Sequence, residues 1–401
     1  MSPKEPKKSL GSNDSIAGIN GVGNSVTIHS SFSEITPTHW NSLVPPDSPA
    51  LRYEFLSAFE KSGCVGQGTG WVPQHLVLYD SGKLIAAAPC YLKYHSYGEY
   101  IFDWDWVHAY QRAGIAYYPK ILLAIPFTPI SGQRLLTHPT VDHQSTGLVI
   151  SASLLKLAET TSASSVHCLF TTARDDELLK KVGFIQRQGN QFHWSNRDYK
   201  DFSDFLSGFS SKKRKNILRE RRSINTENIT FRWLTGHTAT ATDWSFFYSC
   251  YQATIKEHGA IPYLNELFFR LVGKSMPNNV LLIIAQQQER DIAAAFFLRG
   301  EYSLFGRYWG AIDRVSNLHF ETCFYQPIEY CIQNKLHRFE AGAQGGHKLN
   351  RGLIPTSVLS MHWLSHPDFF ESVKHYSQQE SRNMQEYQTI LESHSPYKNN
   401  Y

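Results

Sequence analysis

The chain has 401 residues, of which 41% are hydrophobic and 18% charged, and its formal net charge is +4. This length allows about two or three domains, each with its own hydrophobic core, and so small a net charge does not by itself predict a nucleic-acid partner. The six cysteines form no CxxC pair, no apolar run is long enough for a spanning helix, and no secretory signal follows the N-terminal lysines. We therefore expect free thiols and a cytoplasmic protein.

The N-terminal part of the chain begins with a polar segment. Residues 1–30 are rich in Ser, Gly, Asn and Lys and lack periodicity, which predicts a disordered tail. Helical spacing of apolar residues then predicts a helix over 51–60. Two strands, 75–79 and 84–88, follow around a turn at 80–82, and the aromatic run 100–106 predicts another strand. These elements fall in an expected domain over 31–200.

The same order of elements recurs in the second half of the chain. A helix over 264–272, a strand over 280–285, a turn over 286–290 and an aromatic strand over 303–309 repeat the earlier series. The strand after the turn begins with Ile292–Ala295, which repeats the letters of Ile85–Ala88. The shared order predicts a duplicated α+β domain, with the second copy over 201–376. Residues 377–401 are expected to form a helix, 378–391, and a frayed tail.

A helix over 318–334 and a short strand over 336–341 are expected next. Ser316 or Asn317 is a candidate N-cap for the helix. Pro327 lies in its interior and should kink or break it, because an interior proline costs ~3 kcal/mol.

The stretch Phe339–Gly352 contains an acid, two amides, an imidazole, two cations and four glycines. His347 stands where a GxxxxGK phosphate loop needs glycine, and the spacing does not fit GxGxxG either. Glu340 is a candidate general base and His347 a second acid/base candidate, while Lys348 and Arg351 can hold a carboxylate or phosphate. The structural alternative is a glycine-rich turn stabilised by its own salt bridges.

The second aromatic strand carries polar residues among its rings. Strand alternation places Arg307 and Trp309 on one face and Tyr308 on the other, which suits a substrate cleft whose backbone N–H groups hold an oxyanion. The alternative is an ion pair between Arg307 and an acid such as Asp103.

The helix that starts near residue 318 carries a histidine and an acid. His319 shares a helical face with Cys323, whereas Glu321 points elsewhere. For Glu321 a catalytic role and a favourable helix-dipole position remain equal alternatives. The spacings HxxxH, HExxH and CxxC are absent, so we expect no metal site.

A basic run covers Lys212–Arg222 and contains seven cations and one acid. It is either a solvated helix face or a surface that binds a tRNA acceptor stem or another anionic substrate, with strongly salt-dependent affinity.

Six motifs in order carry a resemblance to a known family. They are Gly98–Trp104, Tyr117–Lys120, Pro126–Pro129, Gly306–Gly310, Leu318–Glu321 and Gly342–Arg351. Over residues 42–380 the chain resembles the FemAB-like family of predicted N-acyltransferases, a branch of the GNAT superfamily.

The resemblance implies an α+β protein with two tandem GNAT-like domains, each a mixed, mostly antiparallel sheet flanked by helices. It also implies acyl transfer in which the amine of a small molecule or a peptide attacks the donor directly, with no tightly bound cofactor. The chain lacks the Gln/Arg-x-x-Gly-x-Gly/Ala loop of ordinary GNAT enzymes, which leaves the donor open between acyl-CoA and aminoacyl-tRNA. An RNA-binding or scaffold protein on an inactive transferase fold is the alternative.

The candidate site residues form two groups. Those for catalysis are Glu340, His347 and Glu321. Those for substrate binding are Asp103, Trp104, Arg307, Tyr308, Trp309, His319, Gln344, Lys348 and Arg351.

Overall fold

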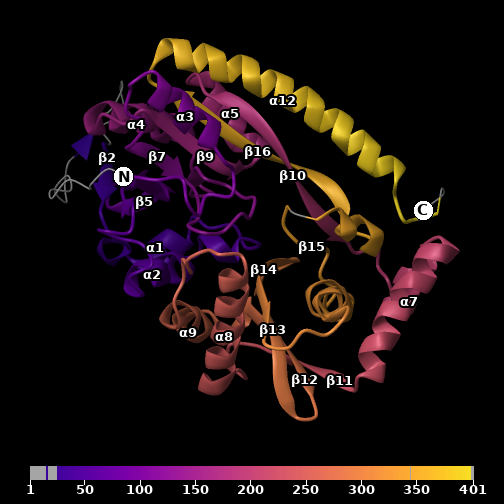
Figure 1. The fold of residues 1–401 in the computed structure, drawn as a ribbon. Coiled ribbons are helices and arrows are strands. Elements are labelled where there is room, and N and C mark those ends of the chain that lie inside the picture. Colours follow the sequence, from indigo (N-terminus) through magenta and orange to yellow (C-terminus); the bar gives the residue numbers. More distant parts are fainter. Residues whose placement is uncertain (1–14, 17–24, 344, 399–401) are drawn as a thin grey trace. The chain divides into compact units, whose positions relative to one another are not determined.

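The computed structural model describes residues 15–16, 25–343 and 345–398, which form two units (Figure 1). Unit 1 contains the described residues up to Pro45, Ala50–Gly189 and Val358–Met384. Unit 2 contains Pro46–Pro49, Asn190–Ser357 and the described residues from Gln385 onward. Residues 358–376, expected in the second domain, thus belong to unit 1. They do so because strand β16 pairs with strand β9 there.

Unit 1 has two sets of hydrogen-bonded strands. The first set, in spatial order, is β1 Ser15–Ile16, β2 Val26–His29, β4 His75–Asp80, β5 Lys83–Ala88 and β8 Leu136–Thr137. The second is β16 Ile354–Leu364, β9 Ser165–Thr171, β7 Lys120–Leu123, β6 Cys90–Lys93 and β3 Trp71–Pro73. Strand β16 begins in unit 2 and enters unit 1 at Val358.

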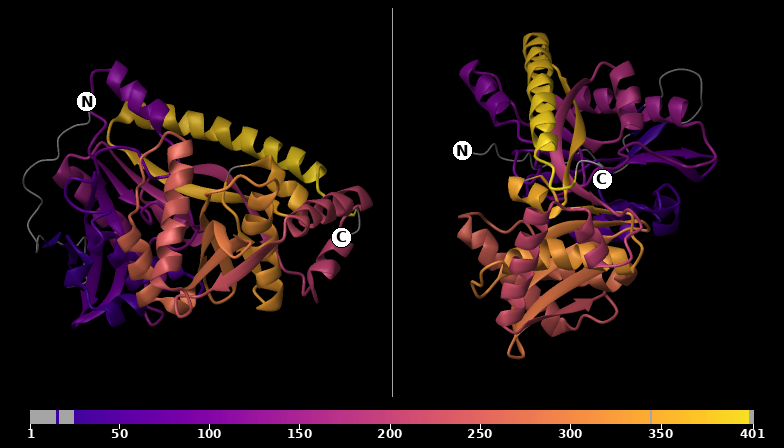
Figure 2. Two further views of the ribbon diagram at one scale, coloured as in Figure 1. Left: turned by 60° about the horizontal axis from the view of Figure 1, so that its bottom comes forward. Right: turned by 90° about the vertical axis from the view of Figure 1, so that its right-hand side faces the viewer.

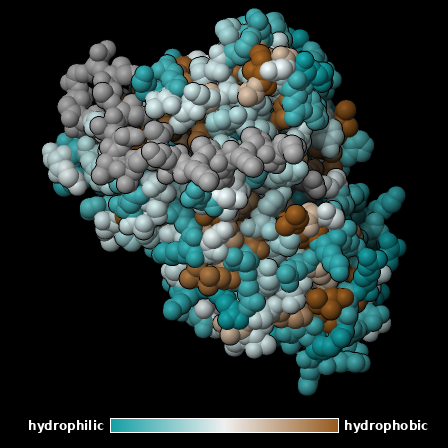
Figure 3. Space-filling model, turned by 60° about the vertical axis from the view of Figure 1, so that its left-hand side comes forward, coloured by the Kyte–Doolittle hydropathy of each residue, from teal (hydrophilic) through white to brown (hydrophobic). Residues whose placement is uncertain are grey.

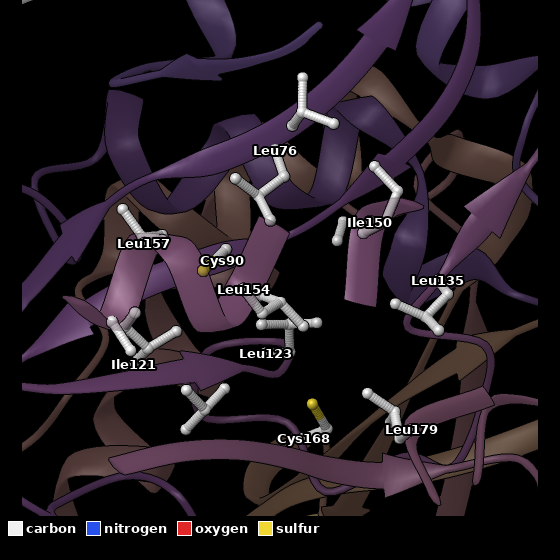
Figure 4. Packing of buried hydrophobic residues seen from close by; sticks show 14 of the residues in the cluster. Leu76, Cys90, Ile121, Leu123, Leu135, Ile150, Leu154, Leu157, Cys168 and Leu179 are labelled. Atoms are coloured by element: carbon white, nitrogen blue, oxygen red, sulfur yellow. The ribbon is translucent and has the colours of Figure 1, made fainter. Parts of the chain in front are cut away.

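The helices of unit 1 are α1 Pro37–Asn41, α2 Tyr53–Lys61, α3 Trp104–Arg112, α4 His143–Thr161 and α5 Ala173–Lys181. Helix α12, Pro367–Ser393, begins in unit 1, and both views of Figure 2 show it as one unbroken rod. The core of unit 1 forms around α4. Figure 4 shows Leu154 and Leu157 of this helix among Leu76, Cys90 and Leu123 of the strands, all of them buried.

Unit 2 is built on strands in the order β11 Ile229–Leu234, β12 Val280–Gln287, β13 Arg290–Arg299, β14 Ser303–Ala311, β15 Arg338–Glu340 and β10 Ile185–Ser195. Adjacent strands in this order are antiparallel, except β14 and β15, which run parallel. The helices are α6 Phe202–Ser207, α7 Ser211–Thr226, α8 Ala241–Glu257, α9 Glu266–Ser275, α10 Leu318–Phe320 and α11 Gln326–Gln333. A π-helical turn, Glu321–Tyr325, joins α10 to α11, and a 3₁₀ helix covers Gly346–Arg351.

Both faces of this sheet are covered by helices, because apolar side chains point to either side of β12 and β13. Phe296 packs against Phe247 of α8 and Phe269 of α9, with ring centroids 5.7 and 5.6 Å apart. Its neighbour Phe297 points the other way and shares a core with Phe324 and the inner side of α11. The sheet therefore lies between two layers of helices (Figure 1).

Most predicted elements are confirmed. In the first half, the helix expected over 51–60 and the hairpin that follows it are α2, β4 and β5. In the second half, the helix expected over 264–272 and its hairpin are α9, β12 and β13. The expected aromatic strand at 303–309 is β14, and the basic run lies in α7. Pro327 does not break its helix, because residues 318–333 are helical without a gap. The π turn ends just before it and α11 begins around it.

Other predictions were wrong. The run 100–106 is not a strand: α3 starts at Trp104, because Trp106, Val107 and Tyr110 have helical spacing and are buried together. Strand β2 lies inside the expected disordered tail, whose residues 1–14 and 17–24 fall outside the described part of the chain. The C-terminal helix begins at Pro367 rather than at residue 378.

The six cysteines form no disulfide, and all except Cys323 are buried. None of the helices described is both long and apolar enough to cross a membrane. On the face drawn in Figure 3, hydrophobic residues form small patches separated by hydrophilic ones.

Candidate active site of unit 2

A cavity opens where two parallel strands separate. β14 and β15 pair over Ser303–Phe305 and Arg338–Glu340, but β15 then ends whereas β14 continues to Ala311. The cavity at this point has a volume of about 570 Å³. Its polar and reactive lining residues are His258, Arg307, Tyr308, His319, Cys323, His347 and Lys348. Among its described lining residues there is no carboxylate.

A β-bulge shapes the strand side of the cavity. The register of β13 and β14 shifts so that Phe296 pairs with Tyr308 and Phe297 with Gly306, which leaves Arg307 as the extra residue. The expected alternation still holds for two of the three residues, because the Tyr308 ring packs against Phe269 of α9 and the Trp309 ring against His319 on the other face. The guanidinium of the extra residue Arg307 lies over the Tyr308 ring, 4.9 Å from its centroid. Arg307, Tyr308 and Trp309 all line the cavity.

The helical side of the cavity carries His319 and Cys323. The His319 ring lies 5.3 Å from that of Trp309, measured between centroids. Burial, together with the nearby cations and His347, lowers the pKa of His319 to about 4, so the imidazole is neutral at pH 7. Burial raises the pKa of the Cys323 thiol, which is therefore protonated. The helical spacing of these two residues was visible in the sequence.

The third side is the glycine-rich loop. Lys348 Nζ donates hydrogen bonds to the carbonyl oxygens of Ala341, at 2.5 Å, and Gly342, at 3.1 Å. Burial lowers the pKa of Lys348 to about 8. Gly345 has φ +99°, and a Cβ there would lie 2.3 Å from the His347 ring, so the loop requires glycine at this position.

His347 faces the other imidazole across the cavity. Its ring centroid lies 6.1 Å from that of His319. Burial, then Arg351 and Lys348, lower its pKa, so it too is a neutral base at pH 7. Its Nε2 is buried and has no hydrogen-bond partner among the described residues. Gln344, the other polar candidate of this loop, lies outside the described residues.

Glu340 does not line the cavity. Phe339 does, and strand alternation turns Glu340 to the opposite face of β15. There its carboxylate lies 3.1 Å from Arg338 and 3.8 Å from His193. Burial raises its pKa to about 7. The geometry thus separates the predicted general base from the cavity.

Glu321 and Arg351 are engaged in ion pairs outside the cavity lining. Glu321 is buried and lies 3.0 Å from Arg221 of α7. Arg351 is 2.9 Å from Glu220 of the same helix. Among its described residues the loop therefore contains no internal salt bridge of the kind considered from the sequence. Its two cations bind backbone carbonyls and α7 instead.

Asp103 and Trp104 lie at the start of α3 in unit 1. Asp103 forms a buried ion pair with Lys120 and accepts a hydrogen bond of 2.6 Å from the Tyr117 hydroxyl, and Lys120 also contacts Glu99 at 2.8 Å. Asp103 is thus paired within unit 1 through its Oδ2, without Arg307, while its buried Oδ1 has no hydrogen-bond partner among the described residues. In the described part of the chain, no group of three His, Cys, Asp or Glu side chains can hold a metal ion.

Sequence reasoning missed several features of the site. His258 follows the end of α8 and Phe324 lies in the π turn, and no local pattern links either of them to the cavity. A second cavity of about 610 Å³ also shares Trp309 and His319 with the first. Only the fold brings these segments together.

Comparisons with known proteins give a family and a fold. A FemAB-like family model, described as peptidoglycan biosynthesis/recognition, matches residues 31–399. A crystal structure of FemX is 10% identical with a TM-score of 0.53, and the match covers 85% of this chain and 98% of that one. The C-terminal domain of a putative lysylphosphatidylglycerol synthetase from Agrobacterium fabrum is 8% identical with a TM-score of 0.54, covering 86% and 96%. A tandem GNAT protein from the clavulanic acid pathway is 8% identical with a TM-score of 0.46, covering 86% and 99%.

No curated protein sequence matches the chain. At these low identities the structural likeness concerns the fold alone. That fold is α+β, as expected from the motifs, and FemX shares it.

Proposed function

The chain belongs to the FemAB-like family, described as peptidoglycan biosynthesis/recognition. We propose that it is an acyl- or aminoacyltransferase, which moves such a group from an activated ester or thioester to an amine in the cavity of unit 2. The observation that carries this proposal is the separation of β14 and β15. It creates a cavity lined by a bulged strand, two neutral imidazoles and a buried cation, with no carboxylate among the described lining residues.

In the proposed reaction the amine nitrogen attacks the donor carbonyl carbon directly. A C–N bond forms, the donor C–O or C–S bond breaks, and the ammonium proton passes to an imidazole. His347 is the first candidate for this base, since its Nε2 is buried and without a hydrogen-bond partner among the described residues, and His319 is the second. The leaving oxygen or sulfur takes up this proton from the imidazolium, which restores the neutral imidazole.

Lys348 is the proposed electrostatic partner of the developing oxyanion. Its Nζ has three protons, of which two are used by backbone carbonyls. With a pKa of about 8 it is mostly charged at neutral pH. A cation fixed in a low-dielectric cavity stabilises negative charge more strongly than one in water. The N–H groups of the β14 bulge are the further donors we propose.

A covalent cysteine intermediate is not favoured. Cys323 lies in the cavity, but burial raises its pKa, and the thiol rather than the thiolate is a poor nucleophile. This supports transfer in one step.

We further propose that the donor is an aminoacyl-tRNA that binds α7. Lys212, Lys215, Arg219 and Arg222 are exposed and share one helical face. None of the four has an acidic partner within 4.0 Å among the described residues. Unneutralised cations in a row suit a phosphate backbone. The family description favours a peptide amine of a peptidoglycan precursor as the acceptor.

The test is transfer of a labelled group to an amine. Radiolabelled aminoacyl-tRNA or acetyl-CoA is incubated with the full chain and a panel of peptide amines, and acid-stable amide product is counted. Activity that needs His347 and Lys348 but survives Cys323→Ser supports the proposal. No product from either donor, with tRNA binding retained, favours a non-catalytic RNA-binding protein or scaffold.

A further inference from the structure

Glu220 lies on α7, outside the cavity, yet its carboxylate contacts Arg351 and Tyr325, which belong to the two segments that carry the lining residues His347 and His319. We propose that Glu220 is a positioning residue of the transfer site, which holds the loop with His347 and the helical turn with His319 in one arrangement. This inference rests on the function proposed above, and its test is chosen to separate the two.

The link to the loop runs through Arg351. Its Nη2 donates to both carboxylate oxygens of Glu220, each at 2.9 Å. Its Nη1 donates to the backbone oxygen of His347 at 2.8 Å. The guanidinium also stacks on Phe320, 3.4 Å from the ring centroid, and the side chain is 6% exposed. Glu220 therefore fixes His347 through one intervening residue.

The link to the helix runs through Tyr325. Its hydroxyl donates to Glu220 Oε2 in a short hydrogen bond. Tyr325 closes the π turn that carries Cys323 and follows His319. One carboxylate therefore connects the two segments that hold the two imidazoles.

Only an ionised carboxylate satisfies these partners together. A guanidinium and a hydroxyl are both donors here, and a carboxylate offers acceptor sites alone. An amide of the same size presents one acceptor oxygen and leaves the buried Arg351 without a counter-charge. Glu220 is the only acid in the run Lys212–Arg222. A second contact, from Lys213 to Asn350, joins the same helix to the same loop.

The charge of Glu220 also acts on His347. The charged groups around this imidazole are Arg351, Lys348 and Glu220, and His319 is the titratable neighbour. The two cations lower the pKa of His347 and Glu220 raises it. Removing the negative charge should therefore lower this pKa further.

The experiment compares Glu220→Gln with Glu220→Asp and with Glu227→Gln. Glu227 is exposed at the C-cap of the same helix and is the matched control. The pKa of His347 is measured by NMR titration of its ring, and transfer is assayed as above. We expect Glu220→Gln to lower the pKa and to reduce kcat ~10- to 100-fold with KM nearly unchanged. Glu220→Asp should restore the pKa and only part of the rate, and Glu227→Gln should change neither.

An unchanged His347 titration together with kcat equal to that of Glu227→Gln overturns the inference. If the wild-type chain transfers nothing, the proposed function fails, but the titration still decides whether Glu220 controls His347. Should Glu220→Gln not fold, Tyr325→Phe removes the helical link alone, and it must lower kcat for the inference to stand.

Discussion

The exposed face of α7 allows a quantitative test of RNA binding. Lys212, Lys215, Arg219 and Arg222 can be changed together to Gln without touching Arg221, which stabilises Glu321 and Glu329. Because the four side chains are exposed, the variant should keep its fold. Any loss of binding then reports on charge.

The expected size follows from counterion release. If each of the four cations neutralises one phosphate, the slope of log K against log salt includes about −0.7 to −0.9 per contact, or roughly −3 in total. Raising the salt from 50 to 200 mM should then weaken wild-type binding by on the order of 10²-fold through these contacts. The variant should lose that part of the slope.

The assay is filter binding of unfractionated tRNA at several salt concentrations. A second variant with Lys83, Lys200, Lys274 and Lys335 changed to Gln has the same net charge and keeps α7 intact. We expect its slope to match the wild type. If both variants lose slope equally, binding depends on net charge and the reasoning about α7 is refuted. Equal binding to heparin would show a preference for polyanions in general.

Three more predictions concern pH, unit 1 and the sheet of unit 2. The rate of transfer should fall in acid as the cavity imidazoles gain protons, and it should fall again above pH 8 as Lys348 loses a proton. Lys348→Met should abolish the alkaline limb of the kcat/KM profile. In unit 1, burial would raise the pKa of Asp103, but Lys120 and His167 outweigh burial and lower it. The ionised carboxylate therefore stabilises the fold fully above pH ~4, and this stabilisation declines as the pH falls further. Asp103→Asn should lower the free energy of unfolding in urea by ~3–5 kcal/mol at pH 7 and by less at pH 3. Gly310→Ala would place its Cβ 1.8 Å from a backbone oxygen of α8 and should cost at least ~1–3 kcal/mol by the same measurement, whereas Gly346→Ala meets no atom within 4 Å and is the control.

The sequence predicted the fold wherever a pattern was local and long. The apolar residues of β12 and β13 and the helical spacing in α2 and α9 are complete within their own segments. The segment around Asp103 shows the opposite case. Its aromatic residues favour a strand by composition, but burial of Trp106 and Tyr110 against residues far away in the chain decides for a helix.

The candidate site was predicted in part, for a similar reason. The spacing of residues in the sequence showed that His319 and Cys323 share one helical face and that the glycine-rich loop carries several polar side chains. It did not reveal which face of the three-residue strand β15 meets the cavity, and this decides the position of Glu340. Partners distant in the chain, such as Glu220 for Arg351, have no local signal.

The π turn at Glu321–Tyr325 has a consequence for how this site can change in evolution. A π turn contains one residue more than an α turn. The residues before it therefore point in different directions around the helix axis than they would in an uninterrupted α-helix. His319 stands before the turn, and the buried core helix α11, anchored by Pro327, stands after it. Insertion or loss of a single residue in the turn would rotate the cavity-lining histidine while the core helix stays in place. Such a change would also displace Phe324 and Tyr325, which are buried in the core, so the direction of this histidine is coupled to the packing of unit 2.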